Sequence, residues 1–569
     1  MRITNLEIHN FRGIKESNIC FPFTTRLICL IGAGDSTKST LLKAIEWILW
    51  PTWNLGVCDN DFYNGDITQP IVLRGTFTEL PEKLLSEDRF GLYLRRDNTP
   101  LNQGVDDEPT DDSPICMTIQ LTINDSLEPK WEVVCNRKEA KTISMAERRL
   151  FSVGSIGENY AKDFVWGKSS ILQKYADAKD ILHDAYTSAL REAIKKADLQ
   201  SLDEIASTLI DIGRQYGVGF DADLKNRIMI QSGSPSSSIG LFEGNSPLNQ
   251  RGTGSQRLLS MGLNINTSSD GTLLLVDEIE HGLEPYRLRS LINELRTTYK
   301  TCGQVIITTH SPIAVAECTI DELLIIQSKN GFTQEYTLKG DDKQVNENLQ
   351  AEVRRNAEAF LCKRIIVCEG RTEIGFIRAL DTFLSTAKNY RLSHKGVGVA
   401  DGGESSVFAC AQALRERGYD TCIFMDSDND DDNSKKSIQM PIYGVPVFDW
   451  EEPNSIEEQI FSDVPPTVAE NIVHCAVMEK GIDSVNSELS SADTQYIVSN
   501  EDIRFPTLSR ADQKELGTIA KKKKWFKRID LGEIVGNAVF ESWESIATNN
   551  RLYTTISELI ELVKKDDRT

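Results

Sequence analysis

A glycine-rich loop between an apolar run and a helix pattern is the feature that most constrains this sequence. The loop, Gly32–Ser39, follows the apolar residues 27–31 and precedes the helix pattern of residues 40–49. In this setting backbone N–H groups cradle phosphates, a lysine reaches the outer phosphates and the next hydroxyl binds Mg²⁺. Lys38 and Ser39 stand at those two positions. The segment therefore predicts a P-loop between a strand and a helix.

The loop departs from the usual G-x-x-x-x-G-K-[ST] pattern at one position. Thr37 stands where glycine is expected, and a β-branched residue adopts a positive φ only at a cost. Taken alone, the segment also fits a glycine-rich turn with a lysine nearby by chance. On the nucleotide-binding interpretation, ATP is held by Gly32, Gly34, Lys38, Ser39 and Thr40.

Two further apolar runs end in residues suited to nucleotide chemistry. Residues 273–276 form a buried-strand pattern that ends at Asp277 and Glu278. We expect Asp277 to hold Mg²⁺ and Glu278 to polarise water. A second strand pattern, 305–309, ends at His310, which is placed to sense the γ-phosphate. Each motif alone has a structural explanation, but their order along the chain favours a nucleotide site.

A glycine-containing segment before a helix pattern offers a second phosphate cradle. Within Arg251–Arg257, Gly254 and Ser255 are placed to face a nucleotide held by a partner. With the P-loop, these motifs resemble an ABC ATPase head of the SMC and RecF type. The opening N-F-R-G is typical of those heads, and the resemblance places Arg12 close to the phosphates. Residues 169–225 have a helical pattern that is too short for a long coiled coil. The resemblance implies that they form a dimerisation insert.

Three apolar runs in the second half of the chain also end at acidic residues. One ends at Glu369, with Glu373 one helical turn later, and the others end at Asp401 and at Asp426, which Asp428 follows. The carboxyl ends of parallel strands converge on one edge of a sheet. Glu369, Asp426 and Asp428 should therefore cluster, and their oxygens suit Mg²⁺ or Mn²⁺.

Two other interpretations of the aspartate run compete with a metal site. It could be an EF-hand loop, but Asp431 replaces the glycine and Ser437 the closing glutamate of that motif. It could also be a solvated acidic loop. That explains Asp430–Asp432 but not Asp426, which ends an apolar strand pattern.

The pattern E-G-x-T-E, then G-G, then D-x-D is similar to the Toprim domain of topoisomerases, primases and certain nucleases. An ABC head followed by a Toprim domain resembles the OLD (overcoming lysogenisation defect) nucleases, which include the nuclease subunit of Gabija defence systems and retron-associated OLD nucleases. The resemblance covers essentially the whole chain. It implies ATP binding and two-metal DNA cleavage, as an endonuclease or nickase.

That family also uses an acidic residue after D-x-D and a later lysine. Glu457 matches the acidic residue best, with Asp449 as second choice, and Lys524 matches the lysine best. A basic helix face that contacts phosphates non-specifically explains Lys524 equally well. The implied catalytic residues are Glu369, Glu373, Asp426, Asp428, Glu457 and Lys524. The implied metal ligands are Glu369, Asp426 and Asp428 in this set, and Ser39 and Asp277 beside ATP.

The predicted fold class is α/β, with an ABC-type head followed by a Rossmann-like Toprim domain. The head comprises residues 1–168 and 226–345, interrupted by the helical insert 169–225, and the Toprim domain comprises residues 355–569. Strand patterns occupy 70–80 and 115–135. Residues 97–114, which are polar and acidic, and residues 231–254, which are rich in Ser, Gly, Pro and Asn, predict loops.

Composition limits where in the cell the protein is expected and which partners it is expected to bind. No apolar run reaches the ~18 residues of a membrane helix, and the twelve cysteines lack any C-x-x-C pair, which favours a reduced, cytoplasmic protein. The resemblance to the OLD family implies that the cytoplasm is bacterial. The net charge of −22 disfavours non-specific nucleic-acid binding by the chain as a whole. DNA would then enter along a local basic track at Lys521–Lys524.

The resemblance implies a homodimer or higher even oligomer, and an antiphage role. The defence partner would be a helicase, as in Gabija, or a reverse transcriptase with its DNA product, as in retrons. One rival is a topoisomerase- or primase-like enzyme, although the chain has neither a spare domain for a nucleophilic tyrosine nor a zinc-binding cysteine cluster. Another is an ATP-gated sensor or DNA-repair ATPase with a silent nuclease.

Overall fold

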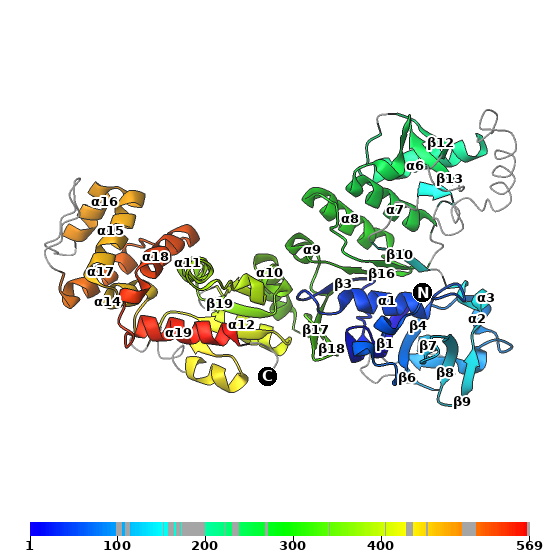
Figure 1. The fold of residues 1–569 in the computed structure, drawn as a ribbon, viewed down its shortest axis with the longest axis horizontal. Helices are drawn as coiled ribbons and strands as arrows, with labels where there is room; N and C mark the ends of the chain where they lie inside the picture. Colours follow the sequence, from blue (N-terminus) through cyan, green and yellow to red (C-terminus); the bar gives the residue numbers. More distant parts are fainter. Residues whose placement is uncertain are drawn as a thin grey trace. The chain divides into compact units, whose positions relative to one another are not determined.

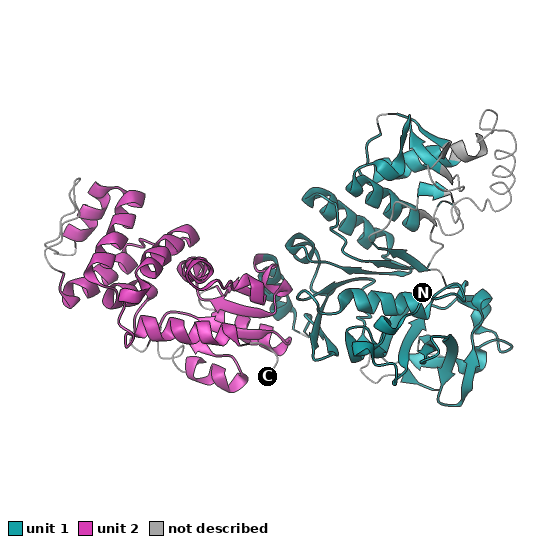
Figure 2. Ribbon diagram, viewed as in Figure 1, with its two compact units in different colours: residues 1–354 teal, residues 355–569 magenta. Residues whose placement is uncertain are grey.

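The chain forms two compact units in the computed structural model, unit 1 (Met1–Arg354) and unit 2 (Arg355–Thr569) (Figure 2). The structure describes residues 1–97, 105–107, 114–151, 153–157, 164–166, 172, 200–220, 222–229, 238–267, 271–340, 342–403, 406–427, 436–450, 453–491 and 508–565. Parallel strands combined with helices are present in both units, so the predicted α/β fold class is confirmed.

A 14-stranded mixed sheet forms the centre of unit 1 (Figure 1). Its order is β10-β15-β16-β3-β17-β18-β2-β1-β4-β7-β5-β6, with β8 beside β7 and β9 beside β8. The first five strands of this order, β10, β15, β16, β3 and β17, pair in parallel. The strands β2, β1, β4, β7, β5, β8 and β9 pair antiparallel with their neighbours in this group. The parallel strands are β10 (Val153–Ile156), β15 (Leu273–Val276), β16 (Gln304–Thr308), β3 (Leu27–Ile31) and β17 (Leu323–Lys329). The others are β18 (Phe332–Thr337), β2 (Ile14–Cys20), β1 (Arg2–Phe11), β4 (Ile71–Thr78), β7 (Ile115–Ile123), β5 (Arg95–Asp97), β6 (Val105–Asp106), β8 (Pro129–Cys135) and β9 (Lys138–Thr142).

The parallel strands are continuous apolar runs because both of their faces are covered. Every residue of β3, β15 and β16 is buried, as expected for a parallel sheet between helix layers. The main helices of unit 1 are α1 (Lys38–Ile48), α6 (Gln200–Gln215), α7 (Thr253–Thr267), α8 (Pro285–Thr298), α9 (Pro312–Glu317) and α10 (Lys343–Arg355). The predicted strand, glycine loop and helix are present as β3, residues 32–37 and α1, and β1 and β2 precede them.

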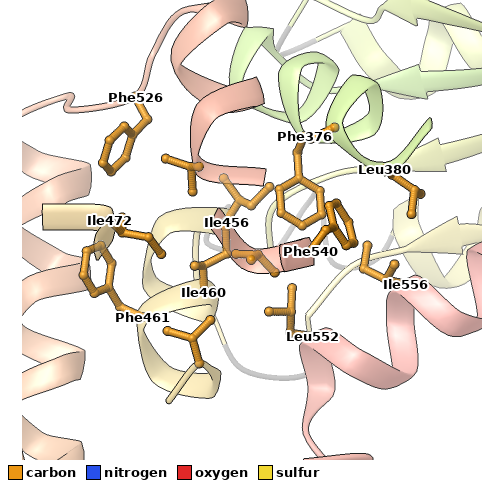
Figure 3. Close-up of a cluster of buried hydrophobic side chains, with 14 of the residues drawn as sticks. Phe376, Leu380, Ile456, Ile460, Phe461, Ile472, Phe526, Phe540, Leu552 and Ile556 are labelled. Atoms are coloured by element: carbon orange, nitrogen blue, oxygen red, sulfur yellow. The ribbon is translucent and has the colours of Figure 1, made fainter. Parts of the chain in front are cut away.

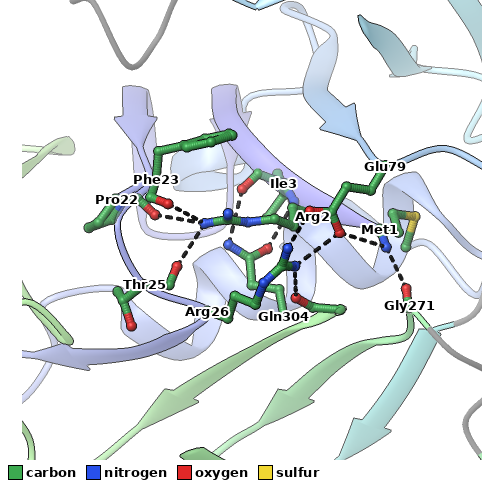
Figure 4. Close-up of polar contacts among 11 residues, drawn as sticks. Met1, Arg2, Ile3, Pro22, Phe23, Thr25, Arg26, Glu79, Gly271 and Gln304 are labelled. Carbon is green, nitrogen blue, oxygen red and sulfur yellow. Dashed lines mark hydrogen bonds and ion pairs between the residues drawn. The ribbon is translucent and has the colours of Figure 1, made fainter. Parts of the chain in front are cut away.

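Polar side chains tie the antiparallel part of the sheet to its parallel core (Figure 4). The Arg2 guanidinium donates to the carbonyls of Phe23 (3.0 Å) and Thr25 (2.7 Å) and lies over the Phe23 ring. The Gln304 side chain of β16 accepts from the N–H of Ile3 (2.9 Å) and donates to its carbonyl (3.2 Å). These contacts fix the start of β1 beside β16 and beside the segment that precedes β3 and the P-loop.

Two predicted loops contain strands in their described parts. Within residues 231–254, β13 (Ser238–Glu243) pairs with β12 (Leu224–Met229) and β11 (Val165–Trp166), and β14 (Ser246–Pro247) pairs with β13. Within residues 97–114, β6 pairs with β5. Composition misleads in both places because backbone pairing with a neighbouring strand outweighs the weak β-propensity of the side chains.

The predicted helical insert 169–225 lies partly outside the described residues, which omit 169–171, 173–199 and 221 of it. Its described part contains α6, and β12 begins before the predicted end of the insert. No helix among the described residues is long and apolar enough to cross a membrane.

Unit 2 is built on a four-stranded parallel sheet in the order β20-β19-β21-β22. Its strands are β19 (Arg364–Cys368), β20 (Val397–Asp401), β21 (Asp420–Phe424) and β22 (Val447–Phe448). Its helices are α11 (Arg371–Lys388), α12 (Val407–Glu416), α14 (Ile456–Asp463), α15 (Pro466–Lys480), α16 (Ile482–Ser490), α17 (Arg510–Lys522), α18 (Ile529–Glu541) and α19 (Arg551–Lys564). One apolar core joins the sheet and α11 to the later helices, with Phe376 of α11 packed on Phe540 of α18 (Figure 3).

Candidate functional site

The P-loop joins β3 to α1 and has the tight backbone that phosphate binding needs. Gly32 has φ 139°, and a Cβ there would lie 2.3 Å from the carbonyl oxygen of Ile326. Only glycine fits this position. Gly34 is exposed and open on its Cβ side, so the loop has room for a ligand at that point. Thr40 lies in the first turn of α1.

Lys38 is buried and folded back on the loop. Its ammonium donates to the carbonyls of Gly32 (2.9 Å) and Ala33 (2.8 Å) and to the hydroxyl of Ser36 (3.1 Å). Burial lowers the pKa of Lys38 to about 8. A bound phosphate would replace these neutral acceptors with charged ones, which make stronger hydrogen bonds.

Thr37 adopts the left-handed conformation that a glycine would adopt, with φ 66° and ψ 12°. Its hydroxyl contacts the carbonyl of Ser36 (2.6 Å) and the hydroxyl of Thr333 in β18 (3.0 Å), and Thr333 in turn donates to Ser328 (3.2 Å). Its methyl group faces Gly13. The hydroxyl contacts offset the backbone cost, because a threonine can make them where a glycine cannot.

Ser39 and Asp277 meet at the end of the parallel strands. The Ser39 hydroxyl donates to Asp277 Oδ1 (2.8 Å), which also accepts from the Thr308 hydroxyl (2.6 Å). Asp277 follows β15, and Thr308 ends the adjacent β16. The two predicted ligands of the nucleotide's Mg²⁺ therefore lie side by side.

The residues after Asp277 connect the strand ends. Glu278 has φ 47°, and its N–H donates to the Thr308 hydroxyl (2.8 Å). Glu280 accepts from the hydroxyl of Thr309 and from the N–H of His310, each at 2.6 Å. The His310 side chain is exposed, so it is accessible at the end of β16.

The predicted second phosphate cradle lies at the start of α7. Gly254 packs so tightly that a Cβ would lie 2.2 Å from the carbonyl of Gly282, whereas Ser255 is half-buried. One turn later Arg257, which is fully buried, donates to the carbonyls of Asp277 and Glu278. Sequence analysis missed Arg257, which links α7 directly to the acidic residues after β15.

Arg12 lies at the end of β1 and contacts α1 rather than the loop. Its guanidinium pairs with Asp61 (2.9 Å) and lies over the Trp47 ring (5.6 Å), and its φ is 51°. Its neighbour Gly13 faces Thr37. The Arg12 guanidinium therefore has an ion-pair partner in Asp61, and its contact with the phosphates stays a prediction.

In unit 2, Glu369 and Asp426 lie at the carboxyl ends of adjacent parallel strands. Glu369 follows β19 and Asp426 follows β21, and the N–H of Asp426 donates to Glu369 Oε2 (2.9 Å). Asp426 Oδ1 accepts from the N–H of Ile456, at the start of α14 (2.8 Å). The structure thus brings these two predicted ligands together.

Glu373 and Glu457 are buried beside this edge, with relative exposures of 3% and 2%. Glu373 Oε1 and both carboxylate oxygens of Glu457 have no hydrogen-bond partner among the described residues. Burial raises the pKa of Glu373 to about 7, Glu457 and Glu369 act in the same direction, and Lys527 opposes them. Buried carboxylate oxygens without donors are the environment that a cation would satisfy.

Lys527 is the lysine that reaches these carboxylates, with its ammonium 3.9 Å from Glu457 Oε1. Lys524, the predicted lysine, is exposed and makes no ion pair with a described residue. The Thr372 hydroxyl donates to the carbonyl of Phe526 (3.0 Å), which holds the chain before Lys527 against α11. The buried Trp525 next to it was the available sign that the chain turns inward here.

Close helix packing creates this arrangement. A Cβ on Gly375 of α11 would lie 2.1 Å from the carbonyl of Ile529, and one on Gly532 of α18 would lie 2.4 Å from the carbonyl of Thr372. A Cβ on Gly517 of α17 would lie 2.8 Å from the Cα of Glu458. Glycine at these crossings lets α18 and α17 approach α11 and α14 closely.

Two further acidic residues, Asp428 and Asp449, were considered for this site from the sequence. Asp428 lies outside the described residues. Asp449, the second choice for the acidic position, accepts from the Ser437 hydroxyl (2.8 Å) and lies 3.9 Å from Arg551. Within the described residues, no group of three or more His, Cys, Asp or Glu side chains is arranged to hold a metal ion.

Comparisons with known proteins find similarity to ATPase domains and to a nuclease. Residues 1–196 match the family described as AAA ATPase domain, and residues 167–316 match the family described as AAA domain, putative AbiEii toxin, Type IV TA system. The chain is 20% identical over 484 residues to the Old nuclease of Escherichia phage P2, covering 75% of this chain and 77% of that protein. These matches support an OLD-like ATPase-nuclease, and the ATPase families imply ATP binding by unit 1.

Solved structures similar to the chain include three SMC heads. The Smc head bound to the C-winged helix domain of ScpA has a TM-score of 0.38 and 14% identity, and the match covers 60% of this chain and 98% of that one. The Smc head with an extended coiled coil bound to the C-terminal domain of ScpA from Pyrococcus furiosus has a TM-score of 0.37 and 13% identity, with 62% of this chain and 99% of that one covered. The SMC head domain from Thermotoga maritima has a TM-score of 0.30 and 12% identity, with 60% of this chain and 100% of that one covered.

Proposed function

We propose that the chain is an ATP-regulated, divalent-metal-dependent DNA endonuclease or nickase. The observation that carries this proposal is the group of carboxylates at the edge of the unit 2 sheet. The backbone N–H of Asp426 donates to Glu369 there, and the buried Glu373 and Glu457 face Lys527. The similarity to the Old nuclease supports the same activity. The proposal also assigns unit 2 to the Toprim kind.

The carboxylates fit Mg²⁺ or Mn²⁺. All candidate donors are hard oxygens, and three of their buried oxygens lack a hydrogen-bond donor among the described residues. Glu369 and Asp426, with Asp428, would hold one ion, and Glu373 and Glu457 supply the carboxylates for a second. When bound, such ions activate water and stabilise the leaving oxygen in phosphodiester cleavage.

The chain's own residues orient the substrate and handle charge. Lys527 places a cation beside the buried glutamates, where it can neutralise charge that develops on a scissile phosphate. Burial raises the pKa of Glu373 to about 7, and a bound cation would oppose this shift and keep the carboxylate ionised. Asp426 is held by the N-terminus of α14, which fixes its direction.

Unit 1 would bind ATP through the P-loop and regulate cutting. Ser39 and Asp277 are already adjacent and would hold the nucleotide's Mg²⁺, and Lys38 would release its loop carbonyls to reach the phosphates. Glu278 would polarise water and His310 would sense the γ-phosphate. We expect slow turnover because Thr37 replaces the glycine of the loop.

The proposal extends to assembly. A nucleotide held by one copy would be completed by Gly254 and Ser255 of a second copy, so the protein should be a homodimer or a higher even oligomer. Light scattering with and without ATP tests this, and only monomer at micromolar concentration in both conditions would contradict it.

The biological proposal is antiphage defence with a partner, either a helicase or a reverse transcriptase with its DNA product. A metal-dependent nuclease needs restraint in its host cell, and the partner or the nucleotide would provide it. Expression of the gene alone and with its genomic neighbours, followed by phage challenge, tests this. Protection by the protein alone, equal to that of the full locus, would remove the case for a partner.

The central experiment measures cleavage of plasmid and linear DNA in Mg²⁺ and in Mn²⁺. Glu369→Ala and Asp426→Ala should each reduce cutting to background, whereas Glu416→Gln, which removes an exposed carboxylate at the end of α12, should retain it. Full activity of either alanine variant would refute the site. DNA binding without cutting by the unaltered protein would favour the ATP-gated sensor instead.

A further inference from the structure

The turn after α17 presents three lysines to solvent. Lys522 ends the helix, and the N–H groups of Lys523 and Lys524 donate to the carbonyls of Ile519 (2.8 Å) and Lys521 (3.1 Å). The side chains of Lys522, Lys523 and Lys524 are exposed and form no ion pair with a described residue. We call these three residues the lysine turn. Lys521 does not belong to it, because its ammonium is 2.9 Å from Glu458.

The backbone of the lysine turn is held on both sides. The Lys480 ammonium donates to the carbonyl of Lys523 (3.1 Å), and the indole N–H of the buried Trp525 donates to Glu488 (2.6 Å). Phe526 is buried in the unit 2 core (Figure 3). The three lysines therefore project from a fixed backbone, which reduces the ordering needed when they bind a ligand.

The backbone conformation of Lys524 would suit glycine or asparagine better than lysine. Its φ is 53°, in the left-handed region where glycine or asparagine usually follows a helix end. A lysine there accepts a backbone cost. What it adds is a third exposed positive charge next to those of Lys522 and Lys523.

The same turn delivers Lys527 to the carboxylate site. Lys524 and Lys527 are three residues apart, so their Cα atoms are at most about 11 Å apart. Successive phosphates of one strand lie ~3.4 Å apart along a duplex axis. The two lysines are thus close enough in the chain for neighbouring phosphates of one strand to contact the lysine turn and Lys527.

We propose that the lysine turn binds the nucleic-acid backbone immediately beside the phosphodiester that unit 2 cuts. The choice of nucleic acid as ligand rests on the proposed nuclease function. The chain carries a net charge of −22, so three neighbouring lysines that form no ion pair with a described residue are a surface at which a polyanion can approach. Phosphate contacts position a substrate without reading its sequence.

The test measures binding without cleavage. Fluorescence anisotropy of labelled single-stranded and duplex DNA, in EDTA and over a range of salt, compares the unaltered full chain with Lys522→Gln/Lys523→Gln/Lys524→Gln. We expect at least about tenfold weaker binding near 0.1 M salt and a slope of log K against log salt that falls by about 2 to 3. Comparison of the two DNA forms shows which one the turn holds.

A matched control removes three exposed lysines from the opposite edge of the same sheet. Lys363 precedes β19 and Lys388 ends α11. Lys565 follows the end of α19, where the carbonyl of Leu562 accepts from Arg364 at the start of β19. Lys363→Gln/Lys388→Gln/Lys565→Gln should keep the affinity and the salt slope. Circular dichroism of both variants checks that each is folded, and Lys522→Gln/Lys523→Gln repeats the test with Lys524 in place.

Three outcomes would overturn the proposal: no DNA binding by the unaltered chain, unchanged binding by the lysine-turn variants, or equal losses in the control. Its failure is distinguishable from failure of the nuclease proposal. A chain that binds through the lysine turn but never cuts refutes only the nuclease, and a chain that cuts without dependence on the turn refutes only the present inference.

Discussion

The substitution Thr37→Val tests how a threonine is tolerated at a glycine position of the P-loop. Valine keeps the size and branching of threonine, and therefore the unfavourable left-handed backbone, but removes the hydroxyl. That hydroxyl contacts the carbonyl of Ser36 at 2.6 Å and the hydroxyl of Thr333 at 3.0 Å. Valine should therefore reveal the backbone cost that the two contacts offset.

The magnitude follows from these two contacts. A hydrogen bond contributes about 0.5 to 1.5 kcal/mol net, so Thr37→Val should lower the free energy of unfolding of unit 1 by about 1 to 3 kcal/mol. In Thr37→Gly the loss of the contacts is opposed by relief of a left-handed cost of roughly 1 to 2 kcal/mol. The glycine variant should therefore be more stable than Thr37→Val by up to about 1.5 kcal/mol, because this relief outweighs the freedom that glycine gains in the unfolded chain.

The assay is urea unfolding of the full chain, followed at the transition of unit 1, without nucleotide. Thr37→Ser is the matched control, because serine keeps the hydroxyl. A double-mutant cycle with Thr333→Val isolates the contact between the two hydroxyls. If Thr37→Val is as stable as the unaltered protein, the hydroxyl contacts contribute nothing and the explanation is wrong.

Three further predictions concern single side chains. Because Lys38 has a pKa of about 8 and binds phosphate only when protonated, nucleotide affinity should fall as pH rises from 7 to 9.5, and a flat calorimetric profile would contradict this. Arg257→Met removes the donor to the carbonyls of Asp277 and Glu278 and should lower the free energy of unfolding of unit 1 by about 3 kcal/mol, measured in urea. A loss below ~1 kcal/mol would show that the contacts are dispensable. At saturating DNA, Lys527→Met should abolish plasmid nicking while Lys524→Met retains most of it, and the opposite order would favour the residue chosen from the sequence.

Strand ends were the most predictable part of both units. Apolar runs that stop at an acidic residue identified Asp277, Glu369 and Asp426, because a buried parallel strand has a continuous apolar sequence and its polar edge comes next. The contacts between these residues and their neighbours follow from parallel register. The P-loop is predictable for the same reason, since its strand, glycines and helix are contiguous.

Contacts between distant helices could not be predicted in this way. The position of Lys527 depends on Gly375 and Gly532, which allow α11 and α18 to touch, and no local pattern relates these residues. Arg257 was missed because a single arginine in a helix pattern is usually solvated. The partner of Thr37 is Thr333, on a strand that only the folded sheet brings near.

The contact between α11 and α18 that positions Lys527 has a consequence for biosynthesis. Glu369 and Asp426 leave the ribosome first, and the roughly 100 residues that follow take about 5 to 20 seconds to make. During that interval the nascent chain displays acidic strand ends without the cation that faces them in the finished fold. If unit 2 is a nuclease, a ribosome-bound chain is harmless to nearby nucleic acid until α18 docks on α11, and translation itself postpones the first cut.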